Sequence, residues 1–174
     1  CEYFPYEAVR TNVLGAQNIV RALRENNTPV ELVVGISTDK ACKPINVMGM
    51  SKALQERIFI EANRHCPGVR LMCVRYGNVI ASRGSVVPLF LEQIDRGGPV
   101  TVTTSEMTRF LLTLDQAVDT VFTAVRSGQR GEMFIPKLPS VRIVDLARVL
   151  IADYPVEITY TGIRPGEKVH EVLV

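Results

Sequence analysis

The sequence predicts an α/β fold built around a mainly parallel β-sheet. Short apolar runs rich in β-branched residues alternate along the chain with longer segments in which apolar residues recur every three or four positions. The short runs are nearly continuous in apolar character, as expected for strands covered on both faces, and the longer segments have the spacing of amphipathic helices. Strands joined through helices in this way form parallel pairs with right-handed crossovers.

The first half of the chain contains two helix–strand pairs. An amphipathic pattern predicts a helix over residues 8–26, and a buried strand follows at 30–36. A second helix is predicted over 50–64 and a second buried strand at 70–75. The stretch between the first strand and the second helix is polar and interrupted by proline, which predicts a loop over 37–46.

The second half contains shorter elements. Helices are predicted over 85–96, 115–125 and 141–151, and Thr113 is placed to cap the second of them. Strands are predicted at 100–103, 109–112, 133–135 and 156–160. The looser pattern from about residue 99 onward predicts a small lobe that faces the substrate.

Composition excludes several classes of protein. The 174 residues are 47% hydrophobic and 22% charged with a net charge of +2, which argues against disorder and gives no sign of a nucleic-acid partner. No apolar run approaches the roughly 20 residues needed to cross a bilayer, so no membrane segment is expected within this chain. The four cysteines form no CxxC pair and the two histidines stand apart, so we expect reduced thiols, no metal site and a cytoplasmic location.

Polar side chains follow both strands of the first half. The segment Ser37–Thr38–Asp39–Lys40 follows one strand, and Tyr76–Gly77–Asn78 follows the other. Ligands of open parallel sheets bind beyond the carboxyl ends of the strands. A hydroxyl, a carboxyl and an amine in consecutive positions can supply a hydrogen-bond donor, a general acid and a general base to one substrate. The alternative for the first segment is an ordinary polar turn.

The second helix adds two residues to this candidate site. Met48 and Lys52 lie one helical turn apart on the same face, so both can address one ligand. Taken alone, Lys52 has the character of a surface lysine.

Four separated motifs, in this order, resemble one enzyme family along nearly the whole chain. They read VVGISTDKACKPINVMGMSKALQE, VRYGNVIASRGSVVPLF, MTRFLLTLDQAVD and GIRPGEKVHEVLV. The chain resembles the nucleotide-sugar 4,6-dehydratases of the extended short-chain dehydrogenase/reductase superfamily. Among these it is most similar to the UDP-N-acetylglucosamine 4,6-dehydratases of bacterial capsule and polysaccharide biosynthesis.

The resemblance implies a Rossmann-like fold and a set of catalytic roles. In the family, C4 of the sugar gives a hydride to NAD or NADP, water is eliminated across C5 and C6, and the hydride returns to C6. By position, Lys40 would remove the C5 proton and Asp39 would protonate the departing hydroxide. Thr38 would hydrogen-bond the sugar O4, and Lys52 would hold the nicotinamide ribose.

Met48 departs from the superfamily pattern. Most members place a tyrosine there, whose phenolate takes the O4 proton during hydride transfer, whereas a thioether is a poor proton acceptor. Some dehydratases of the family carry methionine at this point. We therefore expect another group, or a water relayed through Thr38, Asp39 or Lys52, to take that proton.

The resemblance also implies contacts to the cofactor and the nucleotide. The cofactor positions correspond to Asn12, Ser37, Lys52, Tyr76 and Gly77. The substrate positions correspond to Asn78, Ser85, Val86, Arg109, Arg164 and Glu167. Arg109 and Arg164 would clamp the diphosphate, because a guanidinium offers fork-like donors to phosphate oxygens. Without the resemblance, both arginines are equally consistent with surface ion pairs.

The glycine-rich turn that opens a dinucleotide-binding domain is missing from this sequence. The resemblance begins midway through the cofactor domain, so we interpret the chain as an N-terminally truncated fragment. Residues 1–98 would form the C-terminal part of the cofactor domain, and residues 99–174 the substrate lobe. We expect this chain in isolation to bind NADPH and NADH poorly, which a fluorescence titration would test.

Two other functions stay open from the sequence. A UDP-sugar 4-epimerase would share the fold but would not need the Asp39–Lys40 pair, and a non-catalytic nucleotide-binding module would explain Met48. With a 4,6-dehydratase, inversion at C5 is a further possibility, since Lys40 could return the proton to the other face. The expected partner is a UDP-sugar, and helices 8–26 and 50–64 are expected to support a homo-oligomer.

Overall fold

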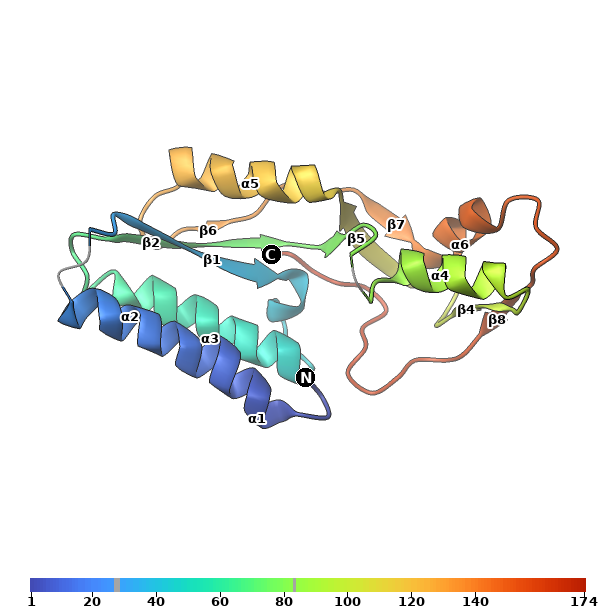
Figure 1. Ribbon diagram of the computed structural model, residues 1–174, viewed down its shortest axis with the longest axis horizontal. Coiled ribbons are helices and arrows are strands. Elements are labelled where there is room, and N and C mark those ends of the chain that lie inside the picture. The colour runs from blue at the N-terminus through green and yellow to red at the C-terminus, as the bar shows by residue number, and fades with distance from the viewer. Residues whose placement is uncertain (27–28, 83) are drawn as a thin grey trace. The chain divides into compact units, whose positions relative to one another are not determined.

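The structure, a computed structural model, describes residues 1–26, 29–82 and 84–174. The chain passes back and forth between two units (Figure 1). The first unit comprises residues 1–76, 115–137 and 172–174, and the second comprises residues 77–114 and 138–171. The functional division into residues 1–98 and 99–174 stays a prediction.

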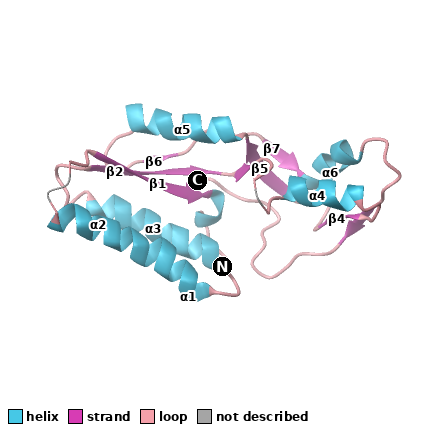
Figure 2. Ribbon diagram, viewed as in Figure 1, coloured by secondary structure: helices cyan, strands magenta, loops and turns pink. Residues whose placement is uncertain are grey.

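The first unit is a three-stranded parallel sheet with helices on both faces (Figures 1 and 2). Its elements are α1 (Pro5–Ala8), η1 (Val9–Leu14), α2 (Gly15–Glu25), β1 (Leu32–Thr38), η2 (Asp39–Ala41), α3 (Val47–Ala62), β2 (Arg70–Tyr76), α5 (Leu114–Ser127) and β6 (Met133–Phe134). The strand order is β1-β2-β6, and both pairings are parallel. This confirms the predicted α/β fold with a parallel sheet.

Side-chain alternation along β2 explains why helices cover both faces of this sheet. Leu71 and Cys73 point to one face and pack with Phe59 of α3 and Ala16 of α2. Met72 and Val74 point to the other face and pack with Ala124 of α5. The near-continuous apolar character of this strand therefore reflects burial on both sides.

β1 lies at one margin of this sheet. Within the described residues it pairs with β2 alone, in a parallel register that sets Ser37 opposite Arg75 and Thr38 opposite Tyr76. Its odd-numbered residues face α3, and Gly35 is required there because an added Cβ would lie 2.5 Å from the Phe59 ring. Ile36, on the other face, is 37% exposed. The prediction that this strand is buried on both faces is therefore wrong at Ile36.

The second unit contains two small sheets and two helices. Its elements are β3 (Asn78–Val79), α4 (Val86–Asp95), β4 (Val100–Val102), β5 (Thr108–Leu112), β7 (Ser140–Arg142), α6 (Ile143–Ile151) and β8 (Ile158–Tyr160). One sheet has the order β3-β5-β7, in which the β5–β7 pairing is antiparallel, and the other pairs β4 with β8 in parallel. Phe90 of α4, Val102 of β4 and Val144 of α6 lie at its core.

Most predicted elements are present, with four differences. The segment predicted as a loop over 37–46 contains the last two residues of β1 and the 3₁₀ helix η2. The first predicted helix begins earlier, at Pro5, and contains the π-helical stretch η1. Strand β3 was not predicted, because it lies in the polar segment that was expected to follow the end of β2. Strand β7 occupies the start of the helix predicted over 141–151, since its three residues pair with β5 before α6 begins.

Within the described residues, no helix is both long enough and apolar enough to traverse a bilayer.

The cysteines differ in their expected reactivity. Cys73 is buried between β2 and α3, and burial raises the pKa of its thiol to about 12, whereas Cys1 is exposed. Because the thiolate is the reactive form, iodoacetamide at pH ~8 should alkylate Cys1 in the folded protein and leave Cys73 unmodified. Peptide mass spectrometry measures this, and alkylation of all four thiols in denaturant is the control. Rapid native modification of Cys73 would contradict the burial described here.

Candidate functional site

The segment that follows β1 folds into a short turn that brings a carboxyl and an amine together. The Thr38 side chain caps this turn, with the Lys40 amide donating to its Oγ1 at 3.4 Å. The Thr38 hydroxyl donates to Asp39 Oδ1 at 2.9 Å, and Lys40 Nζ donates to the same oxygen at 3.0 Å. Three of the predicted catalytic residues are thus in direct contact.

Asp39 is the unusual member of this group. Its side chain is 0% exposed, whereas that of Lys40 is 29% exposed. Its second oxygen, Oδ2, is buried and accepts no hydrogen bond from the described residues. Buried polar atoms are normally paired, so an unpaired carboxylate oxygen is a position where a ligand donor or a proton is expected.

The N-terminal end of α3 is held close to this turn. Asn46 caps the helix by accepting a hydrogen bond from the Gly49 amide at 2.7 Å. A Cβ added to Gly49 would lie 2.2 Å from the Lys40 carbonyl oxygen, so only glycine permits this approach. The Lys40 backbone is therefore fixed against α3.

Lys52, on the same helix, reaches the end of β1. Its Nζ donates to the Ile36 carbonyl at 2.9 Å and to Gln55 Oε1 at 2.8 Å. Burial lowers the pKa of Lys52, and the negative charge of Glu56 opposes that shift. The structure thus brings Lys52 to the strand that carries the Thr38–Asp39–Lys40 turn.

Met48 and Asn12 lie together at the start of α3. Asn12 Nδ2 donates to Ser51 Oγ at 3.0 Å and lies 4.0 Å from Met48 Sδ. The Ser51 hydroxyl in turn donates to the Met48 carbonyl at 3.0 Å. Asn12 belongs to η1, a π-helical stretch of the kind that often occurs at functional sites. Asn12 thus supports the start of α3, and no tyrosine phenolate is present at position 48.

Two further predicted residues lie at the ends of β1 and β2. Tyr76 is paired with Thr38 across the strands, and burial raises the pKa of its phenol. The Ser37 hydroxyl points inward and donates to Glu56 Oε1 at 2.5 Å. Its proton is therefore engaged within the fold.

Sequence reasoning missed Glu56 and Arg75. Glu56 is buried and Arg75 is partly buried, and they form an ion pair, with Arg75 Nη2 2.7 Å from Glu56 Oε2. Neither charge had a visible partner in the sequence, because their contact depends on strand register and helix rotation together.

In the second unit, one pocket of about 240 Å³ gathers all six residues predicted to bind the substrate. They are Asn78, Ser85, Val86, Arg109, Arg164 and Glu167. Its floor is apolar and includes Phe90, Val102 and Met107. A pocket with an apolar floor and a few convergent polar groups has the usual composition of a small-molecule site.

The polar groups of this pocket are held by backbone contacts. Arg109 Nη1 donates to the carbonyls of Thr108 at 2.7 Å and Val169 at 3.1 Å. Glu167 Oε2 accepts from the Arg164 amide at 3.3 Å. Asn78 Oδ1 and Ser85 Oγ are buried and have no partner among the described residues. Ser85 stands at the N-terminus of α4, an end that favours anions.

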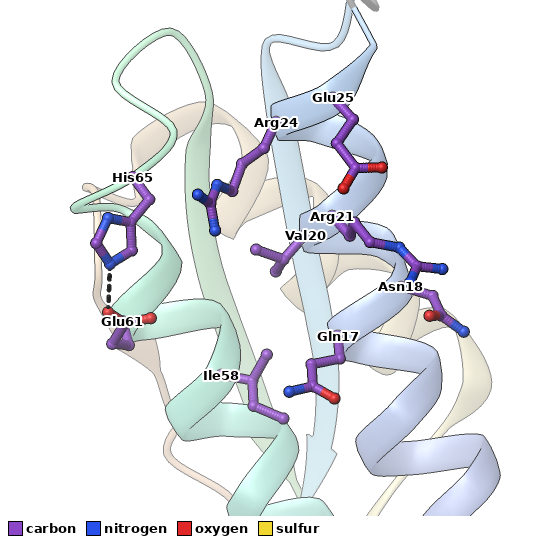
Figure 3. Close-up of a pocket in the computed structure, with 9 residues that line it drawn as sticks. All are labelled: Gln17, Asn18, Val20, Arg21, Arg24, Glu25, Ile58, Glu61 and His65. Atoms are coloured by element: carbon purple, nitrogen blue, oxygen red, sulfur yellow. Dashed lines mark hydrogen bonds and ion pairs between the residues drawn. The ribbon is translucent and has the colours of Figure 1, made fainter.

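A larger pocket, of about 610 Å³, lies between α2 and α3 in the first unit (Figure 3). Arg24 points into the space between the two helices, and His65 is hydrogen-bonded to Glu61 at 2.8 Å. It contains none of the residues predicted to bind substrate or cofactor. Across the described ranges, no three His, Cys, Asp or Glu side chains lie close enough to hold a metal ion.

The family model for polysaccharide biosynthesis proteins matches residues 1–174. The chain belongs to the polysaccharide biosynthesis protein family. This confirms the predicted family, whereas the choice of a 4,6-dehydratase within it stays a prediction.

Relatives with assigned names in this family are longer proteins. The chain is 49% identical over 178 residues to a UDP-glucose 4-epimerase of Rickettsia massiliae, a match that covers 100% of the chain and 52% of that protein. It is 47% identical over 186 residues to an uncharacterized membrane protein of Methanocaldococcus jannaschii, which covers 100% of the chain and 55% of that protein. The chain therefore spans about half the length of the curated relatives it matches.

Solved structures share the fold of this polysaccharide biosynthesis family member. Pen from Bacillus thuringiensis superposes with a TM-score of 0.91 at 38% identity, over 99% of this chain and 56% of that one. The dTDP-glucose 4,6-dehydratase DesIV from Streptomyces venezuelae, solved with NAD and TYD bound, superposes with a TM-score of 0.83 at 18% identity, over 95% of this chain and 57% of that one. The second likeness concerns the fold alone, and the two together confirm a Rossmann-like architecture.

Proposed function

We propose that the full-length protein containing this chain is a nucleotide-sugar 4,6-dehydratase that acts on a UDP-N-acetylhexosamine. The observation that carries this proposal is the Asp39–Lys40 pair. A buried carboxyl with an unpaired oxygen lies 3.0 Å from a partly exposed amine, at the carboxyl end of a parallel strand. Elimination of water needs an acid and a base on neighbouring carbons, and this pair offers both.

In the proposed reaction Lys40 acts first as a base and then as an acid, and Asp39 acts as an acid. After oxidation at C4 has made the C5 proton acidic, the Lys40 amine takes that proton and a double bond forms between C5 and C6. For these roles the proton that Lys40 Nζ shares with Asp39 Oδ1 must first move to the carboxyl, which leaves a neutral amine and a carboxylic acid. The C6–O bond then breaks, and Asp39 gives that proton to the departing oxygen, which leaves as water. Once a hydride has been added to C6, Lys40 would return a proton to C5, which saturates the double bond. The Thr38 hydroxyl would turn from Asp39 to the C4 oxygen to orient it.

The first unit also offers groups suited to a nicotinamide cofactor, NAD or NADP. Lys52 Nζ carries three protons, and its two intramolecular hydrogen bonds leave one for a ribose hydroxyl. Lys52 and Tyr76 would hold the cofactor, with Asn12 supporting the helix that carries Lys52. When bound, such a cofactor accepts a hydride from C4 and returns it to C6. The Ser37 hydroxyl is bound to Glu56, so only the Ser37 backbone would contact the cofactor. A cofactor contact at Gly77 stays a prediction.

The pocket of the second unit would bind the nucleotide. Arg109 and Arg164 supply positive charge for a diphosphate, while Glu167 and Asn78 offer acceptors and Ser85 a hydroxyl. Charge-assisted hydrogen bonds contribute about 1.5–3 kcal/mol each. We therefore expect Arg109→Ala and Arg164→Ala each to raise the KM for the UDP-sugar about 10- to 100-fold, with a smaller change in kcat.

Steady-state kinetics on the full-length protein measures this effect. Arg142→Ala is the matched control, because Arg142 lies in the same unit, outside the pocket, and pairs on the surface with Asp145. An unchanged KM in both pocket variants would contradict a diphosphate role for these arginines.

A UDP-sugar 4-epimerase is the second candidate, and the names of the Rickettsia relatives favour it. The two functions differ in their product. Incubation of the full-length protein with UDP-N-acetylglucosamine, followed by NMR, should yield a 4-keto-6-deoxy sugar with a new C6 methyl signal. A product that keeps its C6 hydroxyl and inverts C4 would identify the epimerase instead, and no conversion with cofactor added would favour a binding module.

A further inference from the structure

A polar layer lies between β1, β2 and α3, directly before the Thr38–Asp39–Lys40 turn. The parallel register sets Ser37 opposite Arg75, and both side chains point to the face covered by α3. Glu56 of α3 meets them there. The residues one step deeper on this face, Gly35 and Cys73, lie against Phe59, so the polar layer caps an apolar core.

The Glu56 carboxylate is tied to both strands. Its Oε1 accepts from the Ser37 hydroxyl at 2.5 Å and from Arg75 Nε at 3.0 Å, and its Oε2 accepts from Arg75 Nη2 at 2.7 Å. Arg75 Nη1 donates to the Leu173 carbonyl at 2.7 Å, which fixes the far side of the guanidinium. This two-point arrangement sets the position of both side chains more strictly than a single contact.

The Glu56–Arg75 ion pair contributes little net stability, because removing its charges from water costs free energy. The Glu56 side chain is 5% exposed and that of Arg75 is 13% exposed. Replacing such a buried ion pair with apolar side chains is often neutral or stabilising, because desolvation offsets the attraction between the charges. A role in holding a defined geometry accounts better for two charges at this position.

Two side chains of α3 form hydrogen bonds with two successive residues of β1. Lys52, one turn before Glu56, binds the Ile36 carbonyl, and Glu56 binds the next residue, Ser37. The strand then continues at once into Thr38 and Asp39. A displacement of Ser37 would therefore also move the Asp39 carboxyl and the Lys40 amine.

We propose that Glu56, clamped by Arg75, is a positioning residue that fixes the Asp39–Lys40 pair through the Ser37 hydroxyl. The catalytic part of this inference rests on the proposed dehydratase function. Its structural part concerns only the first unit and holds for any reaction performed there. The two parts can be measured separately.

Ser37→Ala, Glu56→Gln and the double variant, in the full-length protein, test the proposal. Misplacement of a reacting group by about 1 Å costs up to about 100-fold, so each single variant should lower kcat about 10- to 100-fold and change KM less than about twofold. If both act through one link, the double variant should be no more than about twofold slower than the slower single variant. Additive losses would overturn the shared link.

Amide hydrogen exchange supplies a readout that is independent of turnover. The Cys42 amide donates to the Asp39 carbonyl at 3.1 Å and closes the turn, so a peptide covering residues 38–42 should exchange faster in both single variants. Glu61→Gln is the matched control, because Glu61 lies on the same helix as Glu56 but forms an exposed pair with His65, which follows the helix. That control should leave kcat and the exchange of this peptide unchanged.

The outcomes separate this inference from the proposed function. Faster exchange in both variants, in a protein that forms no 4-keto-6-deoxy product, would support the positioning role and refute the dehydratase. Wild-type exchange together with a kcat within about twofold of wild type, in both single variants, would overturn the positioning role. Ser37→Ala removes a single oxygen and leaves the Glu56–Arg75 pair intact, so it keeps the test valid if Glu56→Gln fails to fold.

Discussion

Lys40→Ala is expected to lower the rate of dehydration about 10²- to 10⁴-fold, the range associated with loss of a positioned acid or base. The amine lies 3.0 Å from the buried Asp39 carboxyl, and its loss leaves no base at C5. Oxidation at C4 does not use this amine, so hydride exchange at C4 should persist. NMR of the 4-keto-6-deoxy product measures the first effect, and the ultraviolet absorbance of the reduced nicotinamide measures the second.

Lys137→Ala is the control for this experiment, since it removes an exposed lysine from the same unit. It should leave both rates unchanged. Equal loss of dehydration and C4 exchange in Lys40→Ala would contradict the assigned step. Retention of full dehydration would remove Lys40 from the reaction altogether.

Gly49→Ala is expected to destabilise the fold and to slow the reaction together. In an exposed helix interior this change adds up to about 1 kcal/mol of stability through helix propensity. Here the new Cβ would lie 2.2 Å from the Lys40 carbonyl oxygen, and both atoms belong to rigid backbone. Forced overpacking of this kind costs about 1–3 kcal/mol, so α3 or the Asp39–Ala41 turn must shift.

Urea denaturation and kcat, measured on the same preparation, test this prediction. Gly68→Ala is the matched control in the same unit, because a Cβ there would meet no atom within 4 Å. A Gly49→Ala protein that is as stable and as active as wild type would show that the close approach of α3 to Lys40 is dispensable.

The elements that periodicity predicted well are those with a long, one-sided pattern. α5 begins and ends within two residues of its predicted limits, in keeping with its amphipathic pattern. α3 also begins and ends within three residues of its predicted limits, although it buries Ser51 and Glu56 and exposes Leu54. β3 was not found because it directly follows β2, in a segment interpreted as polar residues beyond the strand end. β7 was not found because its apolar Val141 fits the helical pattern predicted over 141–151. The π-helical stretch η1 was not predictable either, because its apolar spacing resembles that of an ordinary helix.

Part of the candidate site was predictable from the sequence, and part was not. Contacts within the Thr38–Asp39–Lys40 turn follow from residues adjacent in sequence, and motif resemblance identified the pocket residues that the second unit gathers. The layer of Ser37, Glu56 and Arg75 depends on strand register and helix rotation together. Neither quantity is encoded locally, so the charges at 56 and 75 had no visible partner in the sequence.

The marginal position of β1 has a practical consequence for producing this chain by itself. No second strand pairs with its other side within the described residues, where Lys52 binds the Ile36 carbonyl, and the Ile36 side chain is partly exposed. An apolar strand with an unpaired edge can serve as a template for a second copy of itself. Inclusion bodies and concentration-dependent precipitation are therefore the expected difficulty, and a fusion partner or a charged substitution at Ile36 is the first remedy to try.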